Sequence, residues 1–401
     1  MIDGIIKWSL ENRFFVVIGA LLLFLIGGWQ AYQMPVDVFP NLTAPSVTVV
    51  VEAHGKAPEE VESQITYPIE TALNGATGVR RVRSATGIGN AVIWVEFDWG
   101  MDIYRARQIV SEKLQLVRSQ LPSDIEPPTM GPISSIMGEI MFVAMTSEKH
   151  TPIEIRTEAD WVVRRRLLAV PGVSQVIPIG GGVKQYQVEV DPDRLEALEV
   201  GLDEVSEALR ESNENVSAGF YRENGREYLI YGLGRIDRAE DIGRALIAKR
   251  GGRAITVADV GEVKVAPALK RGDGSFNGED AVIIGIQKQP DANTLELTSR
   301  LDTVFDDLEK TLPEGMKLER HIFRQADFIE IAIENVVDAL RDGALLVILI
   351  ILIFLANARA TAITAAAIPL SLLAATLALD FFGGSINTMT VGGMAIAGGA
   401  L

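Results

Sequence analysis

Apolar and mixed-polarity segments alternate in blocks along this chain. Apolar runs cover Phe14 to Ala31 and most of the chain from Gly343 onward, whereas Asp37 to Asp342 has the mixed composition of a water-soluble domain. A helix that crosses the hydrocarbon of a membrane needs roughly 20 predominantly apolar residues. The pattern therefore predicts one membrane span, a large soluble region and then a series of further spans.

The first apolar run is too long for a secretion signal. It has about 18 residues, against roughly 7–15 for a signal core, and no small-x-small cleavage site precedes Pro35. Lys7 and Arg13 flank its start, and Arg359 lies in the short link between the next two runs. By the positive-inside rule these basic residues face the cytoplasm, which predicts that the soluble region is extracytoplasmic.

The last apolar run ends at Leu401. The stretch from Gly384 to Leu401 is too short to cross the roughly 30 Å of hydrocarbon as a helix. We therefore expect these 401 residues to be the N-terminal part of a longer membrane protein.

Within the soluble region, alternating apolar positions predict strands and helical periodicity predicts helices in the order β-α-β-β-α. This order is most of the split βαβ unit of ferredoxin-like folds, and it occurs twice. The letters repeat as well, since Gly78 to Val82 parallels Gly172 to Val176 and Val95-Glu-Phe97 parallels Val188-Glu-Val190, which predicts two similar subdomains. The second unit is predicted to have strand Glu139–Thr146, helix Pro152–Leu168, strand Val173–Ile179, a Gly180-Gly181-Gly182 turn and strand Lys184–Val190.

An inserted subdomain is predicted to interrupt the second unit from about Asp191 to Lys270. Asp191-Pro192 is typical of a helix start, Asn224-Gly225 of a hairpin turn, and Arg253 to Pro267 of short strands. The final strand and helix of the unit are then expected at Ala281–Ile286 and Ala292–Leu312.

Composition narrows the possible chemistry. No cysteine is present, so this segment has no disulfide and no thiolate metal site. The net charge of −16 argues against nucleic-acid binding and is compatible with attraction of cations, with a basic partner, or simply with solubility.

The Gly180–Gly182 run lacks the Lys-Ser/Thr of a phosphate loop, so we interpret it as a tight hairpin turn. The histidines, His54, His150 and His321, form no triad spacing, although His54 follows closely after Glu52.

Several motifs carry a resemblance to a known family. The arrangement and the motifs resemble the N-terminal half of a resistance-nodulation-division efflux transporter over essentially the whole chain. Within that family, the sequences of the motifs are most similar to the heavy-metal efflux branch. The general motifs are Asn12-Arg13-Phe14, Pro35-Val-Asp37-Val-Phe-Pro40, Ala57-Pro-Glu-Glu-Val61-Glu, Asn357-Ala-Arg359, Ala367-Ile-Pro-Leu370, Ser385-Ile-Asn387 and Gly392-Gly-Met394-Ala-Ile-Ala397. Those of the heavy-metal branch are Gln64-Ile-Thr-Tyr67-Pro68, Ala91 to Phe97, Asp102 to Arg107 and Val183 to Pro192.

The resemblance implies an α+β membrane protein with transmembrane helices and a large periplasmic region of duplicated ferredoxin-like porter subdomains with an inserted docking subdomain. Its implied order is an N-terminal helix and first transmembrane helix at 1–36, the first porter subdomain at 37–130, the second at 131–190 and 271–330, the docking subdomain at 191–270, and transmembrane helices at 331–358, 359–382 and, incomplete, 384–401.

The resemblance also implies function. It implies a bacterial inner-membrane pump subunit, not an enzyme, that exports heavy-metal cations by proton antiport and alternating access. The implied partners are two further copies in a homotrimer, a periplasmic adaptor protein, an outer-membrane channel and the lipid membrane, with no nucleic acid and no cofactor besides the transported ion. The proton-relay aspartates are expected beyond Leu401, and the hairpin from Val216 to Leu233 is expected to reach a neighbouring protomer. Asp380 is expected at the periplasmic rim in a structural role.

Methionines are the candidate metal ligands, because thioethers suit Cu(I) or Ag(I). By the resemblance, Met389 lies where copper and silver transporters carry a relay methionine, and Met394 follows in the same span. Leu269 and Leu401 stand at other such positions, so zinc, cobalt or nickel remains an alternative cargo. A periplasmic group, for which core packing is favoured, comprises Met130, Met137, Met141 and Met145.

Two alternative functions remain open. Export of multidrug-type amphiphiles would need an aromatic, apolar cleft, and only 6% of the residues are aromatic. A non-transporting, membrane-anchored periplasmic scaffold, or a truncated fragment, is the alternative of another class.

Overall fold

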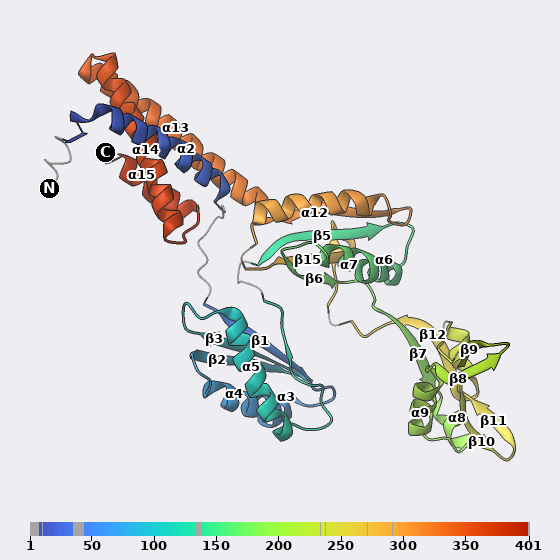
Figure 1. Ribbon diagram of the computed structural model, residues 1–401. Coiled ribbons are helices and arrows are strands. Elements are labelled where there is room, and N and C mark those ends of the chain that lie inside the picture. The colour runs from blue at the N-terminus through green and yellow to red at the C-terminus, as the bar shows by residue number, and fades with distance from the viewer. Residues whose placement is uncertain are drawn as a thin grey trace.

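The computed structural model describes residues 8–9, 11–34, 44–133, 138–232, 234–236, 238–270, 272–290 and 292–399. Apolar helices gather at one end of the molecule, and three mixed α/β bodies follow from it (Figure 1). The N-terminal helix expected before residue 8, the Pro35–Pro40 motif, Met137 and Leu401 lie outside the described residues.

Four helices form the apolar end: α2 (Arg13–Gln33), α13 (Gln325–Leu355), α14 (Ala358–Phe381) and α15 (Thr388–Gly399). Among the described residues, two helical segments are long and apolar enough to cross a membrane, Arg13–Gln33 and Thr361–Phe381. In α13 the apolar part runs only from Gly343 to Leu355, a rise of about 20 Å. The predicted span at 331–358 overlaps α13, whose part before Gly343 is of mixed polarity.

Small residues allow α2 and α14 to approach closely. Gly27 is buried, and a Cβ there would lie 3.0 Å from the Cβ of Leu373. Gly and other small residues are the usual means of close helix contact in membranes.

The first α/β body is a four-stranded antiparallel sheet with helices packed on one face. The strand order is β2-β3-β1-β4, and Val47, Val49 and Val51 of β1 point into the core. The alternation in the sequence predicted this face correctly. The elements are β1 (Ser46–Glu52), α3 (Pro58–Val61), η1 (Glu62–Thr66), α4 (Tyr67–Asn74), β2 (Val79–Gly87), β3 (Asn90–Phe97), α5 (Ile103–Val117), η2 (Arg118–Gln120) and β4 (Thr129–Met130).

The second α/β body repeats this topology. Its strand order is β16-β5-β15-β6. If the strands of each unit are numbered 1 to 4 along the chain, both sheets have the order 4-1-3-2. Gly78 and Gly172 precede the second strand of each unit with φ of 76° and 101°, which confirms the predicted correspondence. The elements are β5 (Glu139–Ser147), α6 (Pro152–Glu158), η3 (Ala159–Val163), α7 (Arg164–Leu168), β6 (Val173–Ile179), β15 (Val282–Lys288), α12 (Thr294–Glu309) and β16 (Met316–Arg324).

The prediction of a hairpin between Val173–Ile179 and Lys184–Val190 was wrong. The strand Lys184–Val190, β7, pairs with β12 (Gly261–Pro267), and the partner of β6 is β15. The repeat at Val188-Glu-Val190 is therefore no structural equivalent of Val95-Glu-Phe97. Alternation of apolar residues defines a strand and its faces, but it does not identify the neighbouring strand.

The Gly180–Gly182 run has another role than a hairpin turn. Gly181 has φ of 64°, and a Cβ there would lie 2.8 Å from the carbonyl oxygen of Pro152. A Cβ at Gly180 would lie 2.5 Å from the backbone nitrogen of Gly274, in the returning chain. These glycines therefore let the outgoing chain pass close to α6 and to the chain that returns from the insertion.

The third body is the insertion, reached through the β7–β12 ribbon (Figure 1). Its hairpin β8–β9 turns at Asn224 and Gly225, both with positive φ, as the sequence predicted. Strand β9 is exposed along its whole length. The elements are α8 (Pro192–Ala197), α9 (Leu202–Ser212), β8 (Val216–Glu223), β9 (Arg226–Gly232), α10 (Ala239–Gly243), β10 (Leu246–Arg250), β11 (Arg253–Thr256) and α11 (Val257–Val260), and β13 (Ser275–Phe276) and β14 (Glu279–Asp280) follow on the return path.

Candidate functional site

A cavity of about 820 Å³ lies between the first and second α/β bodies. Helices α5 and α12 both begin at its wall, because the capping residues Asp102 and Asn293 line it. Each cap accepts a hydrogen bond from its own helix, from Arg105 N at 2.9 Å and from Glu296 N at 3.1 Å. Two similar units thus turn equivalent helix starts toward one shared space.

The wall of this cavity contains a residue that sequence analysis missed. Met101 lines the cavity next to Asp102 and Tyr104. Its position directly before a helix N-cap and after a strand was the available signal, but no methionine spacing marked it. The Met101 side chain also packs against the core of the first body, and the Asp102 carboxylate caps α5.

The methionines of the α/β bodies that the sequence singled out, where their positions are described, do not converge. Met141 and Met145 are fully buried in the core of the second body. Met130 belongs to β4 of the other sheet, where it pairs with Val49 and packs against the core of the first body. Their surroundings are those of core side chains.

Met389 and Met394 lie on α15, whose start is fixed by Asn387. The Asn387 Oδ1 accepts hydrogen bonds from the backbone nitrogens of Met389 at 3.1 Å and Thr390 at 3.0 Å. This cap explains the Ser385-Ile-Asn387 motif. The Met389 side chain is 64% exposed. The Met394 sulfur instead lies 3.8 Å from Thr376 Oγ1 of α14, whose hydroxyl donates to the carbonyl of Leu372 at 2.9 Å.

The two methionines face different directions. Five residues along an α-helix correspond to a rotation of roughly 140° and a rise of about 7.5 Å. Met389 and Met394 therefore cannot bind one ion together from the same helix. Of the two residues, Met389 is exposed and Met394 is half-buried.

Asp380 has a partner that the sequence did not reveal. Gln30 Nε2 of α2 donates a hydrogen bond to Asp380 Oδ2 of α14 at 2.9 Å, and both groups are partly buried. The pair joins the ends of two helices far apart in sequence. This contact is the structural role expected for Asp380.

A clamp of charged side chains joins the second body to α13. Arg324, the last residue of β16, donates two hydrogen bonds to the carboxylate of Asp302 on α12, both 2.9 Å long. Its Nε donates to Asp327 Oδ1 in the first turn of α13 at 3.1 Å. The hydrogen bond to Asp302 raises the pKa of Arg324. Arg324 thereby connects strand β16 to both α12 and α13.

Known proteins match this chain over almost its whole length. The model of the AcrB/AcrD/AcrF family matches residues 5–401. The chain is 34% identical to protein HelA of Legionella pneumophila and 32% identical to the cobalt-zinc-cadmium resistance protein CzcA of Cupriavidus metallidurans, in each case over 98% of this chain and 38% of the relative. It is also 32% identical to the cation efflux system protein CusA of Escherichia coli, over all of this chain and 38% of the relative.

Solved structures agree. A crystal structure of a heavy metal efflux pump superimposes with a TM-score of 0.86 at 27% identity, over 96% of this chain and 39% of that pump. The chain thus spans about two fifths of the length of the relatives it matches. Its similarity is to transporters rather than to enzymes. The chain belongs to the AcrB/AcrD/AcrF family, the resistance-nodulation-division transporters, and its relatives include heavy-metal efflux pumps.

Proposed function

We propose that this chain is part of an inner-membrane pump subunit that exports heavy-metal cations by proton antiport and alternating access. The observation that carries the proposal is the clamp at Arg324, because it joins a body that borders the cavity directly to an apolar helix. Alternating access in transporters proceeds largely by rigid-body movement of one part against another, and a rigid connection of this kind suits such movement. The names of CzcA and CusA, as cation efflux proteins, supply the class of cargo.

The order of parts in this proposal is the one expected from the sequence. Two porter subdomains flank the cavity, and the insertion is a docking subdomain for an adaptor protein and an outer-membrane channel. The proton-relay aspartates lie in the part of the pump beyond this chain. All of the large bodies are periplasmic.

Assembly as a homotrimer is part of the proposal. The β8–β9 hairpin exposes Phe220, Tyr221 and Tyr231, although a lone two-stranded ribbon is marginally stable in water. Exposed aromatic clusters mark protein contacts. A photo-crosslinking amino acid at position 221 of the full-length pump should yield products whose masses are those of a dimer and a trimer of the subunit.

The test of cargo is a tolerance panel. A metal-sensitive, pump-deleted host carries the full-length gene with its adaptor and channel, and growth is scored on copper, silver, zinc, cobalt, nickel and bile salts. Protection against a set of metals supports the proposal. Protection against bile salts alone would assign the protein to amphiphile export instead.

Met389 is the proposed soft ligand of the membrane part. Met389→Leu keeps the size and removes the sulfur, so it should lower tolerance to copper or silver at unchanged expression. Met394→Leu is the matched control, because the Met394 sulfur already contacts Thr376. Unchanged tolerance to copper, silver and zinc in Met389→Leu would exclude this methionine from the transport path.

A further inference from the structure

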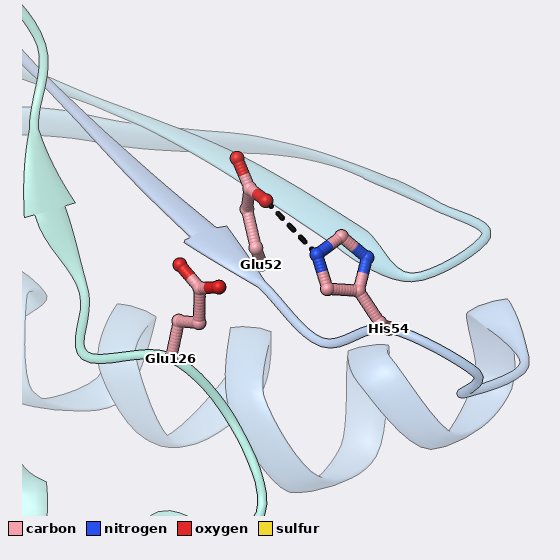
Figure 2. A group of neighbouring side chains, drawn as sticks. All are labelled: Glu52, His54 and Glu126. Carbon is pink, nitrogen blue, oxygen red and sulfur yellow. Dashed lines mark ion pairs between the residues drawn. The ribbon is translucent and has the colours of Figure 1, made fainter. Parts of the chain in front are cut away.

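Three potential metal ligands converge on the first body, away from the cavity between the bodies. Glu52 ends β1, His54 follows it, and Glu126 arrives on the segment that leads to β4 (Figure 2). The His54 Nε2 and Glu52 Oε2 atoms are 3.2 Å apart. One ligand atom from each of the three residues lies within 4.8 Å of the other two.

Backbone hydrogen bonds fix the positions from which these side chains extend. Glu126 N donates to the carbonyl of Glu52 at 3.1 Å. The turn that carries His54 is tied to the β2–β3 turn, because Ala53 N donates to Gly89 O at 2.8 Å and Gly89 N donates to Lys56 O at 3.1 Å. The main chain is therefore set, and only side-chain rotation is needed to bring the ligand atoms closer.

Charge around the three residues also suits a cation. The nearest lysine in the sequence, Lys56, forms an ion pair with Asp124 at 2.8 Å. Across the described ranges, no lysine or arginine lies within ion-pair distance of the Glu52 or Glu126 carboxylates. Two carboxylates and one imidazole thus share a small region without a compensating fixed positive charge.

The geometry points to a binding site for a borderline divalent cation, Zn²⁺, Co²⁺ or Ni²⁺, formed by Glu52, His54 and Glu126. Ligands bound at 2.0–2.2 Å in tetrahedral geometry lie about 3.4 Å from one another. The His54–Glu52 distance already has nearly this value, and the Glu126 carboxylate, whose ligand atom lies within 4.8 Å of the other two, must approach by at most about 1.4 Å.

The donor set defines the class of ion. Imidazole nitrogen and carboxylate oxygen suit zinc, cobalt and nickel, whereas Cu(I) and Ag(I) prefer sulfur. The side chains of His54 and Glu52 are 65% and 53% exposed, so water completes the coordination and the ion exchanges with solvent. Binding rests only on these residues; a role in gathering cargo for export rests on the proposed function.

The competing explanation is an ordinary surface ion pair between His54 and Glu52. Such exposed pairs contribute about 0–1 kcal/mol and require no metal. Glu126 separates the two explanations, because it has no part in that ion pair but is needed as the third ligand.

The experiment measures zinc binding to the purified full-length protein in detergent by titration calorimetry. Glu126→Gln and His54→Gln should each lose one bound zinc per subunit or weaken it at least tenfold. His150→Gln is the matched control, since His150 contacts the Ser147 hydroxyl and no carboxylate cluster, and it should bind like the unchanged protein. Equal zinc binding by Glu126→Gln and the unchanged protein would overturn the proposal.

A spectroscopic measurement on the unchanged protein keeps the test independent of variant folding. X-ray absorption at one bound zinc per subunit should show nitrogen and oxygen neighbours at 2.0–2.2 Å, and sulfur neighbours near 2.3 Å would overturn the assignment. Loss of zinc binding in Glu126→Gln with unchanged metal tolerance in cells would retain the site but remove its role in export. Loss of tolerance in every strain would contradict the proposed function and leave the binding result standing.

Discussion

Replacing Asp302 by asparagine should loosen the junction between the second body and α13. The substitution keeps the shape of the side chain but removes its charge and turns one acceptor into an NH₂ group that faces the Arg324 guanidinium. The Arg324 side chain is only 12% exposed and that of Asp302 32% exposed, so water compensates the loss incompletely.

The size of the effect follows from the two hydrogen bonds. Hydrogen bonds to charged groups contribute about 1.5–3 kcal/mol each, and breaking a buried pair costs about 3–5 kcal/mol. One acceptor and the Asp327 contact remain, and Asp302 is partly solvated, so we expect a cost of about 2 kcal/mol. At about 1.4 kcal/mol per factor of ten, local opening becomes roughly 30-fold more frequent.

Hydrogen exchange followed by mass spectrometry measures this opening directly. Amides of β16 and of the first turns of α13 should exchange roughly 30-fold faster in Asp302→Asn, a factor from the same conversion. Asp306→Asn is the matched control on the same helix: Asp306 is 64% exposed, and its partner Arg320 keeps Glu309, so the expected change is about twofold. Equal acceleration in both variants would refute the reasoning.

Three further perturbations test other parts of the structure. Burial raises the pKa of Glu158, so this residue lowers the stability of the folded state as the pH rises from its unfolded-state pKa through its folded-state pKa. Glu158→Gln should remove this loss. The urea midpoint should then fall less between about pH 4 and pH 7 than it does in the unchanged protein. Gly181→Ala should lower the free energy of unfolding, measured by urea titration, by more than about 2 kcal/mol, because a Cβ there meets Pro152. Gly251 also has positive φ but has open space around it, so Gly251→Ala should lower the free energy of unfolding by only about 1 kcal/mol. Gln30→Leu removes the donor to Asp380 while keeping the bulk, and it should lower the melting temperature of the detergent-solubilised protein; an unchanged melting temperature would show that the pair contributes nothing to helix association.

The sequence predicted those features that depend on local pattern. Alternating valines placed β1 and its buried face, Gly78 and Gly172 marked equivalent turns, and Asn224-Gly225 marked a hairpin. Each of these is decided within a few residues by side-chain period or by backbone sterics.

Features that depend on long-range pairing were predicted wrongly or missed. The partner of β7 lies far along the chain in β12, so the sequence period could not identify it. The same holds for the approach of Glu126 to Glu52, which requires the chain to return beside β1. In the candidate site, the cavity wall at Met101 and the link from Gln30 to Asp380 likewise needed three-dimensional structure.

The direct joining of β16 to α13 makes that helix a lever. Arg324 ends the strand, Gln325 begins the helix, and no loop separates them to absorb a rotation. A rigid helix of 31 residues is about 47 Å long, so a tilt of 5° at the junction displaces its far end by about 4 Å. Any tilt of β16 would therefore be carried directly to the far end of α13.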